Sequence, residues 1–131
     1  MIIDRSAILA ILFTESDAAE FAQAISTAAS CKISAATFVE VAVVVEAQTK
    51  GSGSLQLDTL LRRARITIEP VTEEQAHLAR QAYTDFGKGR HPAGLNFGDC
   101  FSYALAKASG QALLFKGNDF SKTDIASALA A

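Results

Sequence analysis

The sequence predicts an α/β fold in which a mainly parallel sheet is covered by helices on both faces. Short apolar runs of strand length alternate along the chain with longer segments that carry apolar residues at helical spacing. Residues 112–115 are continuously apolar, as in a strand that is buried on both faces. The chain has 131 residues, is 50% hydrophobic and contains no internal repeat, which predicts a single ordered domain over residues 1–131.

In the first half of the chain, residues 1–4 and 31–34 are the expected strands. A helix over residues 6–13 has Ser6 as a plausible cap, and a second helix starts at Ser16 with acidic residues in its first turn. The helix after the second strand ends near residue 48. Its apolar positions are expected on one face: Ala36, Val39, Ala42 and Val43.

The second half repeats this alternation after a brief Gly/Ser break at residues 51–54. A leucine-rich helix leads into a strand over residues 66–71. Thr72 and Gln75 form a capping box for the next helix, whose apolar face is expected to carry Tyr83. The remaining elements are a loop over 87–95, a helix from Asn96 stopped by Gly110, a central strand over 112–115 and a short last strand within 125–129.

Four carboxylates stand alone in otherwise uncharged, mostly apolar stretches. Asp4 and Asp119 follow expected strands, and Glu40 and Asp99 lie in the first turns of expected helices. An unpaired buried carboxylate is costly, so such groups are usually paired, protonated or bound to a metal. Ligand sites in parallel sheets gather at the carboxyl ends of the strands. The pattern therefore predicts one shared site for divalent cations.

Each of these acids also has a structural explanation. Asp4 fits a helix cap, although Ser6 fits that position at least as well; Asp99 fits a capping box with Asn96; and Asp119 fits an ordinary turn. Glu40 has no basic residue within its own helix, which favours a metal-linked role. Asp124 is left open between a cap and a contribution to the site.

Composition restricts the possible functions. The net charge is −2, but without the four acids ten acidic residues face twelve basic ones, a balance of +2 that permits nucleic-acid binding. No apolar run is long enough to span a membrane. The N-terminus carries an acid at position 4 and no basic leader, so a signal peptide is not expected, and the two isolated cysteines leave a reducing cytoplasm as the expected compartment. There is no nucleophile elbow or Walker loop, and His77 and His91 pair with no nucleophile by sequence.

The segment 87–91, which reads Gly-Lys-Gly-Arg-His, lacks the strand-to-helix context of a phosphate loop. Alone it is typical of a mobile surface loop. Beside an acidic site, Lys88 and Arg90, together with Lys116, become candidates for binding an RNA backbone.

Four stretches resemble the PIN domain, and closely the VapC toxins of bacterial toxin–antitoxin pairs. They are MIIDRSA at 1–7, SAATFVE at 34–40, LNFGDCFSYALA at 95–106 and LLFKGNDF at 113–120. The resemblance covers essentially the whole chain. Arg5 departs from it, because the family more often has a small hydroxyl residue there, whereas the hydroxyl of Ser6 is kept.

The resemblance implies a three-layer α/β/α sandwich with a four- to five-stranded sheet. It implies an endoribonuclease dependent on Mg²⁺ or Mn²⁺, with tRNA as a frequent substrate. Asp4, Glu40, Asp99 and Asp119 would form the catalytic and metal-binding site, with Asp4 and Asp99 as the firmest ligands and with Ser6 and Asn118 in support. It also implies a VapB-type antitoxin and a homodimer.

Other interpretations stay open at this point. A catalytically inactive PIN-type module that binds only RNA or its antitoxin would have the same sequence features, and DNA is another possible substrate. A receiver-like signalling domain also binds Mg²⁺ through acids, but it needs adjacent acids after the first strand, and Asp4 stands alone.

Overall fold

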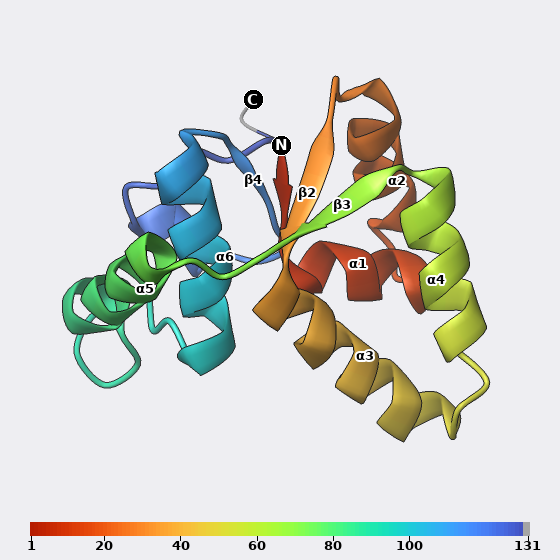
Figure 1. Ribbon diagram of the computed structural model, residues 1–131, viewed down its shortest axis with the longest axis horizontal. Helices are drawn as coiled ribbons and strands as arrows, with labels where there is room; N and C mark the ends of the chain where they lie inside the picture. The colour runs from red at the N-terminus through yellow and green to blue at the C-terminus, as the bar shows by residue number, and fades with distance from the viewer. Residues whose placement is uncertain (130–131) are drawn as a thin grey trace.

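The chain folds into three layers, with a sheet between two layers of helices, in a computed structural model that describes residues 1–129 (Figure 1). Within these residues the sheet has four parallel strands in the order β3-β2-β1-β4. Their bounds are Ile2–Ile3 (β1), Cys31–Ser34 (β2), Ile66–Glu69 (β3) and Leu113–Leu114 (β4). The three-layer α/β/α fold is therefore confirmed. Residues 130–131 of the expected domain lie outside the described part of the chain.

The helices divide between the two faces of the sheet (Figure 1). One layer contains α1 (Arg5–Leu12), α2 (Ala18–Thr27), α3 (Ala35–Thr49) and α4 (Ser54–Arg63). The other contains α5 (Glu73–Phe86) and α6 (Phe97–Ser109), and a short 3₁₀ helix, η1 (Phe120–Lys122), follows β4. None of the helices within residues 1–129 combines the length and apolar character needed to cross a bilayer.

Each face of the sheet has its own hydrophobic core. Successive side chains of a strand point to opposite faces, so Ile2 and Leu113 pack against α5 and α6. Ile3 and Leu114 pack against the opposite layer, and all four residues are fully buried. Strands of two residues can be central in this fold because both of their faces are covered.

Side-chain caps start four of the helices where the sequence offers Asp, Ser, Thr or Asn. The capping residues are Asp4 (α1), Ser34 (α3), Thr72 (α5) and Asn96 (α6). The predicted start at Asn96 and stop at Gly110 are confirmed, and Gly110 adopts the left-handed conformation common after a helix. Ser6 is not the cap of the first helix, because its backbone N–H lies inside the first turn and donates to the Asp4 carboxylate.

Two predictions about the C-terminal strands are wrong in part. One concerns the place of β4 in the sheet and the other the extent of the segment within 125–129. β4 lies at the edge of the four-stranded sheet rather than at its centre. The last segment forms a single bridge between Leu113 and Ser127 instead of a strand. Its backbone covers the open edge of β4 through the Leu113 N–H to Ala126 O and Ala128 N–H to Leu113 O bonds, both 2.9 Å long. This covering explains why an edge strand is as apolar as a central one.

Two expected helix faces are also wrong in part. Val39 and Val43 are 56% and 61% exposed, while α3 buries Thr37, Val41 and Val45 instead. Apolar residues occur on every side of this helix, so hydrophobic spacing alone did not identify its buried face. In α5, Tyr83 is exposed.

Candidate active site

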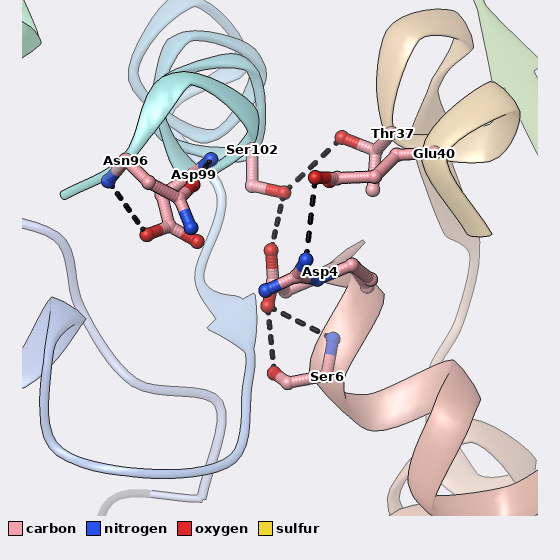
Figure 2. A network of polar contacts seen from close by, with 8 residues as sticks. Asp4, Ser6, Thr37, Glu40, Asn96, Asp99 and Ser102 are labelled. Carbon is pink, nitrogen blue, oxygen red and sulfur yellow. Dashed lines mark hydrogen bonds and ion pairs between the residues drawn. The ribbon is translucent and has the colours of Figure 1, made fainter. Parts of the chain in front are cut away.

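Asp4 lies at the carboxyl end of β1, where the chain turns into α1. Its side chain is buried, and the residue is only 3% exposed. The Oδ2 atom accepts hydrogen bonds from the Ser6 hydroxyl at 2.6 Å and the Ser6 N–H at 3.0 Å, and Oδ1 accepts one from the Ser102 hydroxyl at 2.6 Å (Figure 2). These donors offset the loss of water around a buried carboxylate.

Ser6 also connects two strand ends. Its hydroxyl donates to Asp4 and accepts a hydrogen bond from the Lys116 N–H at 2.9 Å. The backbone N–H of Asp4 donates to Leu114 O at 2.9 Å, so the end of β1 is attached to the end of β4. Ser6 thus holds the orientation of Asp4. Its predicted role in support of a catalytic site stays a prediction.

Ser102 and Thr37 form a second pair of buried hydroxyls behind Asp4. They come from α6 and α3, are 0% and 1% exposed, and their oxygens lie 3.3 Å apart (Figure 2). A serine hydroxyl has one proton, and Ser102 donates it to Asp4, so Thr37 is the donor to Ser102. Sequence reasoning missed both residues. The available signal was the spacing of Ser102 three positions after Asp99, which places both on one side of α6.

Replacing Ser102 with alanine is expected to lower the free energy of unfolding by about 1.5–3 kcal/mol, because a buried carboxylate loses a charged hydrogen bond. Urea denaturation measures this loss. Ser109→Ala is the matched control, since the Ser109 hydroxyl bonds only to carbonyls of its own helix. A loss no larger than that of Ser109→Ala would contradict the assigned bond to Asp4.

Asp99 lies in the first turn of α6, 8% exposed. Its Oδ2 accepts the N–H of Asn96 at 3.0 Å, and its own N–H donates to Asn96 Oδ1 at 2.9 Å, so the expected capping box is present. The pKa of Asp99 is raised from 3.8 to about 6, mainly because the carboxyl is buried. The hydrogen bond from the Asn96 backbone lowers this pKa but does not cancel the effect of burial. The charges of Asp4 and Asp119 raise this pKa further, which indicates that the carboxylates act on one another at this edge.

Glu40 reaches this region from α3 and forms an ion pair with Arg5, whose Nη1 lies 3.2 Å from Glu40 Oε2. Both side chains are 31% exposed. The sequence interpretation found no basic residue within the helix of Glu40; the partner instead comes from α1. Glu40 also lies against Gly98 of α6, where any Cβ would overlap its carboxylate. Figure 2 shows that Asp4, Glu40 and Asp99 come from three separate segments of the chain at this end of the sheet.

The fourth predicted acid and its neighbours are more open. Asp119 is exposed at the start of η1, where its side chain makes no capping hydrogen bond. Asn118 is exposed, and its carbonyl accepts the Ser121 hydroxyl at 2.6 Å. Asp119 still contributes to the raised pKa of Asp99. It is therefore at the border of the site rather than inside it.

Two other candidates have partners of their own. The Lys116 ammonium pairs with Glu15 and, at 3.3 Å, with Asp17, which raises the pKa of Lys116. Asp124 accepts a hydrogen bond from Tyr103 Oη at 2.8 Å and pairs with Lys107 at 2.6 Å, and the Lys107 ammonium lowers the pKa of Asp124. Asp124 thus serves as a structural partner of α6.

The basic segment is fixed at its ends by the backbone. Lys88 N–H donates to Leu95 O and Leu95 N–H donates to Phe86 O, both at 2.9 Å. His91 is structural, because its Nδ1 accepts the Ala93 N–H at 3.0 Å and its ring packs edge-on against Phe86. The structure places Lys88 and Arg90 beside α5 and Lys116 beside α2, so the three cations do not form one cluster.

The donor set fits a hard cation, although the ligands are not gathered into a closed cage. Within residues 1–129, no three Asp, Glu, His or Cys side chains lie close enough to hold one ion together. Glu40 is turned to Arg5, and one oxygen of Asp99 is turned to Asn96. Mg²⁺ uses one or two carboxylates and keeps several waters, so the oxygens of Asp4 and Asp99 are a suitable pair.

The profile of the PIN domain family matches residues 1–126 of this chain. The chain therefore belongs to the PIN-domain family. Two mycobacterial proteins are each 52% identical to it over 130 residues, with 98% of both chains covered. They are the VapC ribonuclease Mb0625 of Mycobacterium bovis and the ribonuclease VapC28 of Mycobacterium tuberculosis. The ribonuclease VapC of Mycolicibacterium smegmatis is 49% identical over 126 residues, which are 96% of this chain and 98% of that relative.

These relatives confirm the resemblance to VapC proteins that the sequence motifs indicated. Among solved structures, VapC20 of Mycobacterium tuberculosis, described as a sarcin–ricin loop cleaving toxin, matches with a TM-score of 0.77. The match covers 95% of both chains at 14% sequence identity. At that identity the likeness establishes the fold alone.

Proposed function

We propose that this protein is a Mg²⁺-dependent endoribonuclease and the toxin of a type II toxin–antitoxin pair. The observation that carries the proposal is the buried carboxylate of Asp4 at the carboxyl end of β1, whose charge acts on the buried carboxylate of Asp99. Glu40 lies against Gly98 in the same first turn of α6. Membership in the PIN family and the names of the close relatives support a ribonuclease.

Asp4 and Asp99 are the proposed metal ligands, with Glu40 and Asp119 as further ligands or as groups that orient the attacking water. Mg²⁺, or Mn²⁺ in its place, lowers the pKa of water and polarises a phosphoryl oxygen when bound to such carboxylates. Ser6 and Ser102 hold both oxygens of Asp4 in one orientation. Arg5 holds Glu40 at the edge of the site and carries a positive charge that suits an anionic phosphate.

The substrate proposal is RNA, with tRNA as the first class to test. Lys88 and Arg90 remain candidates for contacts to the phosphate backbone, because they are exposed. Lys116 is a weaker candidate, since its ammonium is already paired with Glu15 and Asp17. A VapB-type antitoxin and a homodimeric state complete the proposal.

Incubating the purified protein with RNA or DNA, in Mg²⁺ or in EDTA, tests the activity. RNA cleavage is expected in Mg²⁺ only, and Asp4→Asn is expected to remove both cleavage and the rise in melting temperature that Mg²⁺ gives the wild type. Glu74→Gln, at an exposed acid of α5, is the matched control.

Restoring Mg²⁺ to EDTA-treated wild type keeps this test decisive if Asp4→Asn does not fold. Binding of RNA without cleavage would favour the inactive module. Cleavage of DNA alone, or cleavage that persists in EDTA, would contradict the proposed reaction.

A further inference from the structure

A surface groove lies beside the first turn of α6, and the acids of the candidate site are not among its described lining residues. This groove of about 630 Å³ runs between α5 and α6, which lie side by side in Figure 1. Its size is within the range of small-molecule sites. Its aromatic lining is Tyr83, Phe97 and Phe101, with small side chains of α5 between them.

Phe97 is the most exposed large hydrophobic residue described, at 79%. It is the first residue of α6, and its ring lies edge-on to Phe101 with the ring centroids 5.0 Å apart. Because the residue is so exposed, the Phe97 ring is available for another flat group to stack on it. The Phe97 ring contributes nothing to the hydrophobic core of the protein, since Phe97 belongs to neither core cluster.

The charged residues of the groove are all positive. Arg80 and Lys88 line it, no Asp or Glu is among its described lining residues, and the Arg90 guanidinium lies 5.6 Å from the centroid of the Tyr83 ring. A surface that combines exposed aromatic rings with cations matches single-stranded nucleic acid, whose bases stack and whose phosphates are anionic.

The groove and the acidic site share one residue. Asn96 lines the groove, and its backbone N–H donates to the Asp99 carboxylate at 3.0 Å. The acids and the aromatic groove therefore both lie at the N-terminal end of α6, so one strand of RNA that crosses this end can contact both.

We propose that this groove binds the base of a nucleotide next to the cleaved phosphodiester, stacked on Phe97, with Arg80 and Lys88 contacting the neighbouring phosphates. The inference rests on the proposed ribonuclease function and adds a subsite to it. Charge favours this occupant over a protein segment of mixed charge, because the ionic groups of the lining within residues 1–129 are the cations of Arg80 and Lys88.

Phe97→Ala tests the subsite with little risk to the fold, because the side chain is so exposed. The probe is a short single-stranded RNA that carries 2-aminopurine, a base whose fluorescence falls when it stacks on an aromatic ring. Binding is measured in Mg²⁺ with the Asp99→Asn protein, in which cleavage is suppressed. Adding Phe97→Ala is expected to weaken binding about 5- to 150-fold and abolish the quenching, as loss of one stacked base predicts. Phe97→Trp is expected to keep both.

In the chain with Asp99 intact, Phe97→Ala is expected to raise KM for RNA more than it lowers kcat, as loss of a binding contact does. Val43→Ala, which removes another exposed apolar side chain on α3, is the matched control and should change neither. Unchanged probe affinity and quenching with Phe97→Ala would overturn the subsite.

Sedimentation of the same variants tests the alternative that a second copy of the chain, rather than RNA, occupies the groove. A dimer that becomes monomeric on Phe97→Ala, with RNA binding unchanged, would assign the groove to a second copy of the chain and overturn the proposal. Failure of the wild type to cleave any RNA would instead contradict the proposed function, and loss of probe binding on Phe97→Ala would still report a base site.

Discussion

Replacing Asp99 with asparagine is expected to reduce RNA cleavage at least about 100-fold and, at the same time, to stabilise the metal-free protein at neutral pH. Activity falls because a proposed metal ligand loses its charge. Stability rises because ionising a carboxylate that is 8% exposed costs free energy that the neutral amide does not. The amide oxygen can still accept the N–H of Asn96, so the capping box is kept.

The pH dependence follows from the raised pKa of Asp99, about 6 in the folded chain against 3.8 in its ordinary state. The folded state holds the carboxyl proton of Asp99 more tightly than the unfolded state does. The contribution of Asp99 to the free energy of unfolding is therefore largest below pH 3.8, and it is lost as the pH rises through about 6. The loss amounts to roughly 3 kcal/mol above pH 7, and Asp99→Asn should avoid it.

Urea unfolding in EDTA at pH 7.5 and pH 4 measures the predicted gain in stability and its pH dependence. Asp99→Asn should exceed the wild type at pH 7.5, and most of the difference should disappear at pH 4. Asp58→Asn, at an exposed acid of α4, serves as the control. Equal stabilities at pH 7.5 would refute the burial cost. Mapping RNA ends in cells after induction of either protein reports the loss of cleavage.

Replacing Gly98 with alanine is expected to lower cleavage about 100-fold with a change in stability below about 1 kcal/mol. The added methyl group would occupy the place of the Glu40 carboxylate. Glu40 ends a flexible chain that is 31% exposed, so it is expected to turn into solvent and leave Arg5 unpaired. Alanine favours the helix over glycine, which offsets part of the lost ion pair.

A double-mutant cycle with Glu40→Ala checks this explanation. If Gly98→Ala acts only by displacing Glu40, the double variant should be no less active than Glu40→Ala alone. Initial cleavage rates and urea midpoints of the four proteins give both readouts. A further, multiplicative loss in the double variant would show that Gly98 has another role at the end of α6.

The places of Asp4 and Asp99 at this edge of the sheet were predictable from the sequence. Asp4 follows a strand that the apolar run at the start of the chain identifies, and Asp99 follows the cap Asn96, so local signals placed both. Their proposed role as ligands stays a prediction. Contacts between distant segments have no local signal, which is why Thr37 and the pairing of Arg5 with Glu40 were missed. Ser102 had a local signal in its spacing from Asp99, but its bond to Asp4 joins distant segments as well.

The alternation of strands and helices, the helix ends at Asn96 and Gly110, and the family were predictable from the amino-acid sequence, because these depend on neighbouring residues and on local motifs. The place of β4 at the edge, the exposure of Val39 and Val43 on α3, and the pairing of Glu40 with Arg5 became known from the three-dimensional structure. Each of these depends on which elements pack together. A hydrophobic pattern indicates that a residue can be buried, but the partner across the sheet or the neighbouring helix decides whether it is.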